Sequence, residues 1–238
     1  MLQPDRSPQR AAETLLEMSV ESNSFYYRNK VAETARFMAK LGLIGHSSGN
    51  ISVRIPGCEH QIAITPTRAP NRLLTPDDIC IVDFDGNTTS QLKPSSELQL
   101  HLSLYRGRDN IHAVVHSHPI YATVCSVAGL EIPPLLDELI VLTGGPIRLA
   151  DYALPGTKDL GRNALGALGL HQAVLLRNHG LAAVGHSLEE AQEVSELVER
   201  AAQVFVLSRL LGRVTLLPDE TVELEQRHFQ GLLGPSST

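Results

Sequence analysis

Two histidines, His116 and His118, are separated by a single residue at the end of an apolar run. Residues at i and i+2 of an extended segment point to the same side, so both imidazoles could bind one metal ion. His179 follows a second apolar run, Ala173–Leu176, and precedes Gly180, which leaves room for close approach. The sequence therefore predicts a metal site of three histidine nitrogens at two strand ends.

Glu97 is the acidic residue that we expect beside these histidines. It ends a tight Pro-Ser-Ser-Glu turn, at the start of the helix that precedes the histidine pair. A carboxylate in this place can also simply stabilise the helix through its dipole, so a capping role is the alternative. Next to a Lewis-acidic ion, a carboxylate can move a proton to or from a carbon adjacent to a carbonyl. We therefore predict that Glu97 is a metal ligand or a catalytic acid/base.

Small hydrogen-bonding residues on three glycine- or proline-bearing loops could together hold an anion. They are Asn50, Thr67, Ser95 and Ser96. Each one alone is typical of a turn. Arg68 adds a positive charge that could bind a phosphate or carboxylate, although a surface salt bridge is the commoner role of an arginine. The expected substrate is a small anionic molecule.

The remaining histidines have no second ligand at a useful spacing, so we interpret them as structural or exposed. His101 and His112 are the strongest competitors among them. The chain also has no P-loop, no H-E-x-x-H and no G-x-S-x-G motif. These absences argue against phosphoryl transfer, zincin-type proteolysis and serine hydrolysis.

The secondary structure that the patterns predict is a mixed sheet flanked by helices. Residues 1–7 are expected to form a loose tail. Short strands near 51–54, 61–65 and 79–83 read as an antiparallel meander, and a serine-capped helix then begins with Glu97 in its first turn. Further strands are expected at 112–116, 139–142, 147–150 and 173–177. Further helices are expected at 8–21, 24–43, 119–127, 158–169, 187–211 and 218–232.

The length of 238 residues suits one large α/β domain, and no change of composition marks a linker. We divide the chain into an N-terminal tail and helix over residues 1–24 and a single domain over residues 25–238.

The net charge of −6 argues against nucleic acid as a partner, because phosphate neutralisation needs a basic face. The N-terminal residues have no apolar signal segment, and no apolar run reaches the ~20 residues that a membrane span needs. The three cysteines, Cys58, Cys80 and Cys125, show no C-x-x-C spacing and are interpreted as reduced structural thiols. We expect a cytoplasmic protein that does not bind membranes.

Five motifs, in this order and at these intervals, resemble the class II aldolase/adducin family. The similarity covers roughly residues 27–212. The motifs are GNISVR at 49–54, ITPT at 64–67, KPSSE at 93–97, AVVHSH at 113–118 and RNHG at 177–180.

The resemblance implies a three-layer α/β/α domain around a mostly antiparallel sheet, and a homo-oligomer, specifically a tetramer, with active sites at subunit interfaces. It implies zinc, or alternatively manganese or another divalent first-row ion, on His116, His118 and His179. Glu97 is then the fourth ligand at rest and the acid/base once substrate displaces it.

The other motif residues match loops that hold the substrate phosphate in the sugar-phosphate aldolases of the family. These residues are Asn50, Thr67, Ser95 and Ser96.

Three departures from the family pattern bear on function. Arg68-Ala69-Pro70 stands where the sugar-phosphate aldolases usually have glycine, so recognition of the anion is expected to differ. Related aldolases of the family have a catalytic tyrosine ahead of a glycine pair, and a simple count back from Gly144-Gly145 gives Glu138 at that place. Their C-terminal tyrosine also has no counterpart, because no tyrosine follows Tyr152. The proton donor to the leaving group is therefore unassigned. Glu97, rather than aspartate, argues against the ribulose-phosphate 4-epimerase branch.

The function predicted in this way is a metal-dependent carbon–carbon lyase. We expect an aldolase that cleaves a small phosphorylated or carboxylated hydroxy-ketone through a metal-stabilised enediolate. The alternative is a metal-dependent decarboxylase of a hydroxylated aromatic or keto acid, with Arg68 binding the carboxylate. A more remote alternative is a non-catalytic, adducin-like scaffold, which the four retained metal-ligand residues disfavour.

Overall fold

The structure is a computed structural model that describes residues 8–58 and 60–232. The tail predicted over residues 1–7 lies outside the described residues. A seven-stranded sheet forms the centre of the domain, with the strand order β3-β2-β1-β4-β7-β6-β5. The strands are β1 Asn50–Arg54, β2 Gln61–Ile64, β3 Cys80–Asp83, β4 Ala113–Ser117, β5 Arg148–Ala150, β6 Ala173–Leu176 and β7 Gly180–Gly185.

Every neighbouring pair in this sheet is antiparallel except β5 with β6, which is parallel. The expectation of a mostly antiparallel sheet is therefore confirmed. The antiparallel meander predicted for the first three strands is also present, in the order β1-β2-β3.

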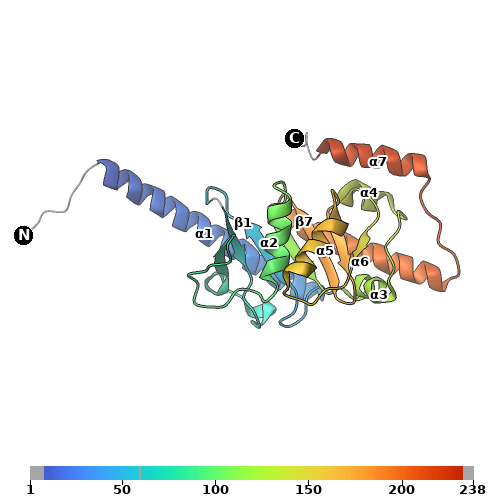
Figure 1. The fold of residues 1–238 in the computed structure, drawn as a ribbon, viewed down its shortest axis with the longest axis horizontal. Helices are drawn as coiled ribbons and strands as arrows, with labels where there is room; N and C mark the ends of the chain where they lie inside the picture. The colour runs from blue at the N-terminus through green and yellow to red at the C-terminus, as the bar shows by residue number, and fades with distance from the viewer. Residues whose placement is uncertain (1–7, 59, 233–238) are drawn as a thin grey trace, which may run out of the picture.

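Helices cover both faces of the sheet (Figure 1). On one face lie α2 (Leu98–Gly107) and α5 (Lys158–Leu168), and on the other lie α1 (Pro8–Leu41), α3 (Ile120–Ala128) and α6 (Leu188–Leu210). Two further helices, α4 (Asp137–Thr143) and α7 (Asp219–Leu232), pack against each other at one end of the domain. The domain thus has the three-layer α/β/α architecture. Among the described residues, no helix is long and apolar enough to cross a membrane.

The period-2 alternation of the strands divides the core into two layers. In β4, Val115 packs in the layer beneath α1 and α6, whereas Val114 packs in the layer beneath α2 and α5. His116 therefore faces α2, like Val114. The register pairs it with Asn50 of β1, which places both side chains on that same face. The sheet thus presents these polar groups to the start of α2.

One helix stands where the sequence predicted two. The patterns predicted helices at 8–21 and 24–43, but α1 runs without a break from Pro8 to Leu41. The break was assigned at Ser22-Asn23, and neither residue prevents a helix from continuing as proline would. The N-terminus of α6 was predicted correctly, since the Ser187 hydroxyl accepts a hydrogen bond from the Glu190 amide at 3.2 Å.

Two further elements differ from the prediction. The strand predicted at 139–142 is helix α4, which has Asp137 and Glu138 in its first turn and ends at Gly144 in a left-handed conformation. Four apolar residues are too few for periodicity to distinguish strand from helix. Strand β7 was not predicted, because its Gly-Leu-Ala-Ala-Val-Gly sequence lacks the usual bulky strand residues.

Close packing of α5 on α2 predicts opposite effects for two glycines of the same helix. A Cβ at Gly161 would collide with the Ser103 hydroxyl and lie 2.9 Å from the Gln99 carbonyl, whereas one at Gly166 meets nothing within 4 Å. We expect Gly161→Ala to lower the free energy of unfolding by about 1–2 kcal/mol through overpacking. The control, Gly166→Ala, should raise it by about 0.5–1 kcal/mol. Urea denaturation measures both, and a stabilised Gly161→Ala protein would contradict the packing described.

Candidate metal centre

His116 is positioned by β7, the neighbour of β4 in the sheet. The β4 residues are completely buried, and the His116 Nδ1–H donates to the carbonyl oxygen of Leu181 in β7 at 2.9 Å. This bond leaves Nε2 without a proton in the neutral ring and directs it away from β7. A backbone carbonyl that fixes a histidine tautomer in this way is typical of metal-binding histidines.

His179 lies in the tight turn between β6 and β7, where Asn178 takes a positive φ of 56°. Gly180 makes the approach of this turn to β4 sterically acceptable. A Cβ at Gly180 would lie 2.5 Å from the Ser117 carbonyl oxygen and 2.8 Å from Cδ2 of His118. The expectation that this glycine permits close approach is confirmed.

Glu97 occupies the boundary position before α2, but its side chain forms no capping hydrogen bond. The sequence predicted a serine cap with Glu97 inside the first turn. Instead, the helix begins at Leu98, and the Ser95 hydroxyl accepts a hydrogen bond from the Glu97 backbone amide at 3.2 Å. This turn directs the carboxylate away from the helix end and toward the histidines.

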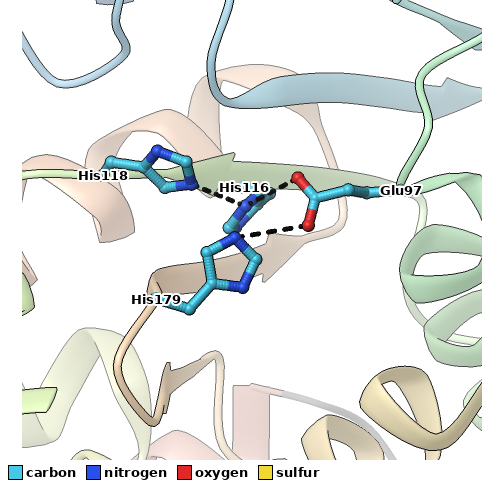
Figure 2. A group of neighbouring side chains, drawn as sticks. All are labelled: Glu97, His116, His118 and His179. Atoms are coloured by element: carbon cyan, nitrogen blue, oxygen red, sulfur yellow. Dashed lines mark hydrogen bonds and ion pairs between the residues drawn. The ribbon is translucent and has the colours of Figure 1, made fainter. Parts of the chain in front are cut away.

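The three imidazoles and this carboxylate converge on one point (Figure 2). The Nε2 atoms of His116 and His118 are 2.9 Å apart. Glu97 Oε2 lies 3.1 Å from His116 Nε2, and Oε1 lies 3.3 Å from His179 Nε2. One ligand atom from each residue lies within 4.8 Å of the other three. Ligands around a tetrahedral zinc ion would be about 3.4 Å apart, so small adjustments would complete the site.

The chemistry of this group fits a divalent metal ion. Among the described residues, nothing donates a hydrogen bond to the buried Glu97 Oε1, and the buried His179 Nδ1 likewise has no hydrogen-bond partner. A buried carboxylate oxygen without a donor is costly unless a cation compensates its charge. Three imidazole nitrogens and one carboxylate oxygen suit zinc and several other first-row ions.

Without a metal, the charge of Glu97 is balanced by His116. Burial raises the pKa of Glu97, but the nearby His116 and His179 rings and the Asn50 amide lower it further, so the net shift is downward. Burial opposes protonation of His116, yet Glu97 outweighs it and raises the His116 pKa. Burial and the neighbouring imidazoles lower the pKa of His118 to about 3 and that of His179 to about 4. A metal ion would therefore compete with a proton for His116 and find the other two rings neutral.

A polar pocket of about 240 Å³ opens beside this cluster. Glu97, His118 and His179 form part of its wall. All the residues predicted to contact substrate also line it: Asn50, Thr67, Arg68, Ser95 and Ser96. Ser47, Ser48 and Gly49, which the sequence analysis did not single out, line it too. The structure thus brings three separate loops and the metal-binding group around one cavity.

Arg68 has an unusual backbone conformation within this pocket. Its φ is 58°, in the left-handed region that favours glycine. The resemblance to the sugar-phosphate aldolases implies glycine here, whereas this chain has a cationic side chain in that conformation. Holding a non-glycine residue in this region costs about 1 kcal/mol. Strain of this kind points to a functional reason for the side chain.

His101, which the sequence analysis interpreted as structural or exposed, is a structural histidine whose contacts the sequence analysis did not predict. It is completely buried, and its ring nitrogens contact Asn50 and Ser52 at 2.5 and 2.6 Å. Its position four residues after Glu97 on α2 is the signal that could have indicated this, because i and i+4 share a helix face. Glu138, at the position of the family's tyrosine, forms an ion pair with Arg200 and does not line the polar pocket.

Comparison with known proteins agrees with the fold. A sequence profile of the Class II Aldolase and Adducin N-terminal domain matches residues 29–206. The chain belongs to this family. Members of the class II aldolase family are divalent-metal-dependent lyases, and this chain is an enzyme of that type with a group that could hold the ion.

Relatives within the class II aldolase family cover most of the chain. It is 35% identical to a 5-deoxy-D-ribulose 1-phosphate aldolase of Bacillus thuringiensis serovar kurstaki, over 86% of this chain and 95% of the relative. It is 33% identical to the L-fuculose phosphate aldolase of Escherichia coli K12, over 85% and 95%. A solved L-fuculose 1-phosphate aldolase superposes with a TM-score of 0.81 at 33% identity, over 86% of this chain and 96% of that one.

The Glu97–His116 pair predicts a pH window for the stability of the metal-free class II aldolase. The lowered pKa of Glu97 stabilises the fold above the unfolded value of about 4.3, and this gain is lost as the pH falls through the folded pKa. The raised pKa of His116 stabilises the fold below about 6.5, and this gain is lost as the pH rises through the folded pKa. Glu97→Gln should therefore destabilise the protein most between about pH 4.3 and 6.5.

Denaturation of both proteins from pH 3 to 8 measures this difference. In a His116→Asn background the decline of the Glu97→Gln effect above about pH 6.5 should disappear, because no His116 proton is then lost. A difference that stays constant across the pH range would contradict the pairing.

Proposed function

We propose that this chain is an aldolase, a carbon–carbon lyase that cleaves a small phosphorylated or carboxylated hydroxy-ketone. The observation that carries the proposal is the convergence of three imidazole nitrogens and an unpartnered carboxylate oxygen beside a polar pocket. The relatives support the substrate class, since one is named for 5-deoxy-D-ribulose 1-phosphate and another for L-fuculose phosphate.

Zinc is the proposed cofactor, with manganese or another divalent first-row ion as the alternative. His116, His118 and His179 would hold it, with Glu97 as the fourth ligand at rest. When bound, such an ion supplies a Lewis acid that stabilises the enediolate left by cleavage of the carbon–carbon bond. The His116 tautomer, fixed by Leu181, supports this role because its Nε2 has a lone pair to donate.

Glu97 is proposed as the acid/base. Cleavage leaves an electron pair on the carbon beside the carbonyl, and that carbon must gain a proton. Glu97 is the only carboxylate among the residues that line the polar pocket, and its Oε1 accepts no hydrogen bond from the described protein atoms. The Asn50 amide donates to Oε2 at 2.9 Å, so the carboxylate can pivot on this bond while Oε1 serves the substrate.

The anionic group of the substrate is proposed to bind in the same pocket. Ser96 and Arg68 are exposed to solvent there, and Thr67 is half-buried. The backbone amide of Thr67 donates to the Lys93 carbonyl at 3.0 Å, so its hydroxyl is the group available to a ligand. The proposed contacts are Asn50, Thr67, Arg68, Ser95 and Ser96.

We also propose a homo-oligomer, specifically a tetramer, with active sites at its interfaces. An exposed apolar stripe on α3, formed by Ile120, Val124 and Val127, lies beside His118 and His179 and supports an interface at this place. A cytoplasmic location is proposed as well. It is supported by the three cysteines, all of which are free thiols.

A metal-dependent decarboxylase is the second candidate, and Arg68 favours it. Loss of carbon dioxide leaves the same kind of enolate as aldol cleavage, so the metal-binding group suits both reactions. A guanidinium in place of glycine could pair with a carboxylate of the substrate through two parallel hydrogen bonds. The specific observation behind this alternative is that Arg68, a non-glycine residue, has a left-handed backbone conformation.

The zinc-loaded enzyme should cleave 5-deoxyribulose 1-phosphate or fuculose 1-phosphate to dihydroxyacetone phosphate and an aldehyde. Removal of the ion with a chelator should abolish turnover, and zinc or manganese should restore it. Glu97→Gln should lower kcat by about 10²-fold or more, because the proton transfer is lost. A coupled assay of dihydroxyacetone phosphate measures all three effects.

Glu223→Gln, an exposed substitution on α7, is the matched control and should have wild-type turnover. Release of carbon dioxide from carboxylated hydroxy-acids, without cleavage of any ketose 1-phosphate, would replace the aldolase proposal by the decarboxylase. Full activity of Glu97→Gln would contradict the assigned acid/base.

A further inference from the structure

A continuous chain of hydrogen bonds leads from Glu97 into the core, and the chemistry described above does not use its inner members. It runs from Glu97 through Asn50, His101 and Ser52 to Tyr105. The last three residues are completely buried, and none of them lines the polar pocket. They therefore act on the site only through Asn50 and Glu97.

The carboxylate determines how the amide of Asn50 must lie. An ionised Glu97 can only accept hydrogen bonds, so the group 2.9 Å from its Oε2 must be the Asn50 NH₂. The Asn50 oxygen then faces His101 Nε2 at 2.5 Å. Because that oxygen can only accept, Nε2 must carry a proton.

The same logic extends to the end of the chain. A neutral His101 with its proton on Nε2 has an acceptor at Nδ1, which lies 2.6 Å from the Ser52 hydroxyl. Ser52 must therefore donate to His101 and accept from the Tyr105 hydroxyl at 2.8 Å. Complete burial lowers the pKa of His101 to about 3, so the ring is neutral. Every hydrogen bond in the chain thus has one direction.

The secondary structure provides this alignment. Glu97, His101 and Tyr105 recur every four residues along one face of α2, and Asn50 and Ser52 alternate on the face of β1 beneath it. The two rows interleave, so that each strand residue lies between two helix residues. Arg54, the next residue in the β1 alternation, donates to the Tyr105 carbonyl oxygen and lies 5.0 Å from its ring.

We propose that His101, as the Nε2–H tautomer, is a positioning residue that holds the Asn50 NH₂ against Glu97, with Ser52 and Tyr105 fixing its tautomer. The proposal rests on the proposed function of Glu97 as a metal ligand and acid/base. Rotation of the Asn50 amide by 180° would set its oxygen against the carboxylate and its NH₂ against the Nε2 proton. The chain of hydrogen bonds excludes that orientation of the amide, and so it keeps the carboxylate directed at the histidines.

The tautomer can be tested in the metal-free protein, independently of any activity. Long-range ¹H–¹⁵N correlation on histidine-labelled protein distinguishes a protonated ring nitrogen from an unprotonated one. The His101 signals are assigned by their loss in His101→Gln. We expect a neutral ring protonated at Nε2. Protonation at Nδ1 alone, or an imidazolium at neutral pH, would overturn the proposal.

Zinc affinity tests the consequence for the site, by competition with a chelator of known affinity. A glutamine amide can occupy the position of the His101 Nε2–H and donate to Asn50, whereas the shorter asparagine cannot. His101→Asn should weaken zinc binding about tenfold or more, as loss of an outer hydrogen-bond partner does. His101→Gln should restore most of that affinity.

Thr143→Val is the control for a merely structural effect, because the Thr143 hydroxyl is also buried and donates to the Leu139 carbonyl, far from the metal-binding group. It should lower stability and leave zinc affinity unchanged. Equal zinc affinity in wild type, His101→Asn and His101→Gln would overturn the proposal. A wild-type protein that binds no divalent ion would overturn the proposed metal site, and the tautomer measurement would still decide the orientation of Asn50.

Discussion

The structure of the site depends on one buried carboxylate, that of Glu97. Glu97 is 8% exposed, and its buried Oε1 accepts no hydrogen bond from the described protein atoms. Such a charge is tolerated only beside a cation. In the metal-free protein the pKa of His116 is raised, which favours a protonated imidazole beside the carboxylate. The pKa values of His118 and His179 are lowered, so these two imidazoles are neutral. The carboxylate and the three rings are therefore suited to exchange one proton for a divalent ion.

The sheet brings these groups together from distant parts of the sequence. The β1–β4 register sets Asn50 opposite His116, and the β6–β7 turn lets His179 approach His118 because Gly180 has no side chain. The carboxylate belongs to the residue before helix α2, and it forms no capping hydrogen bond to that helix. As a result, the three imidazoles and the carboxylate converge on one point and rest on a packed core.

Local chemistry could be predicted from the sequence, whereas long-range pairing could not. The spacing of His116 and His118 and the Gly180 beside His179 were sufficient to predict three of the four side chains that the structure brings together. The five motifs identified the family. Helix α4 was predicted as a strand because four apolar residues have no distinct period, and β7 was missed because its stability comes from its neighbours. The contacts of His101 could not be predicted because its partners, Asn50 and Ser52, lie about fifty residues earlier and meet it only through the sheet.

Anomalous diffraction at the zinc absorption edge, from crystals of the zinc-loaded protein, would locate the ion relative to Glu97 and the three histidines. We expect one anomalous peak per chain at about 2.0–2.2 Å from the Nε2 atoms of His116, His118 and His179 and from a Glu97 oxygen. The Asn50 amide should remain against the other oxygen of Glu97. A site without a peak, or a peak coordinated by other residues, would contradict the claim that this carboxylate is buried in order to hold a metal ion.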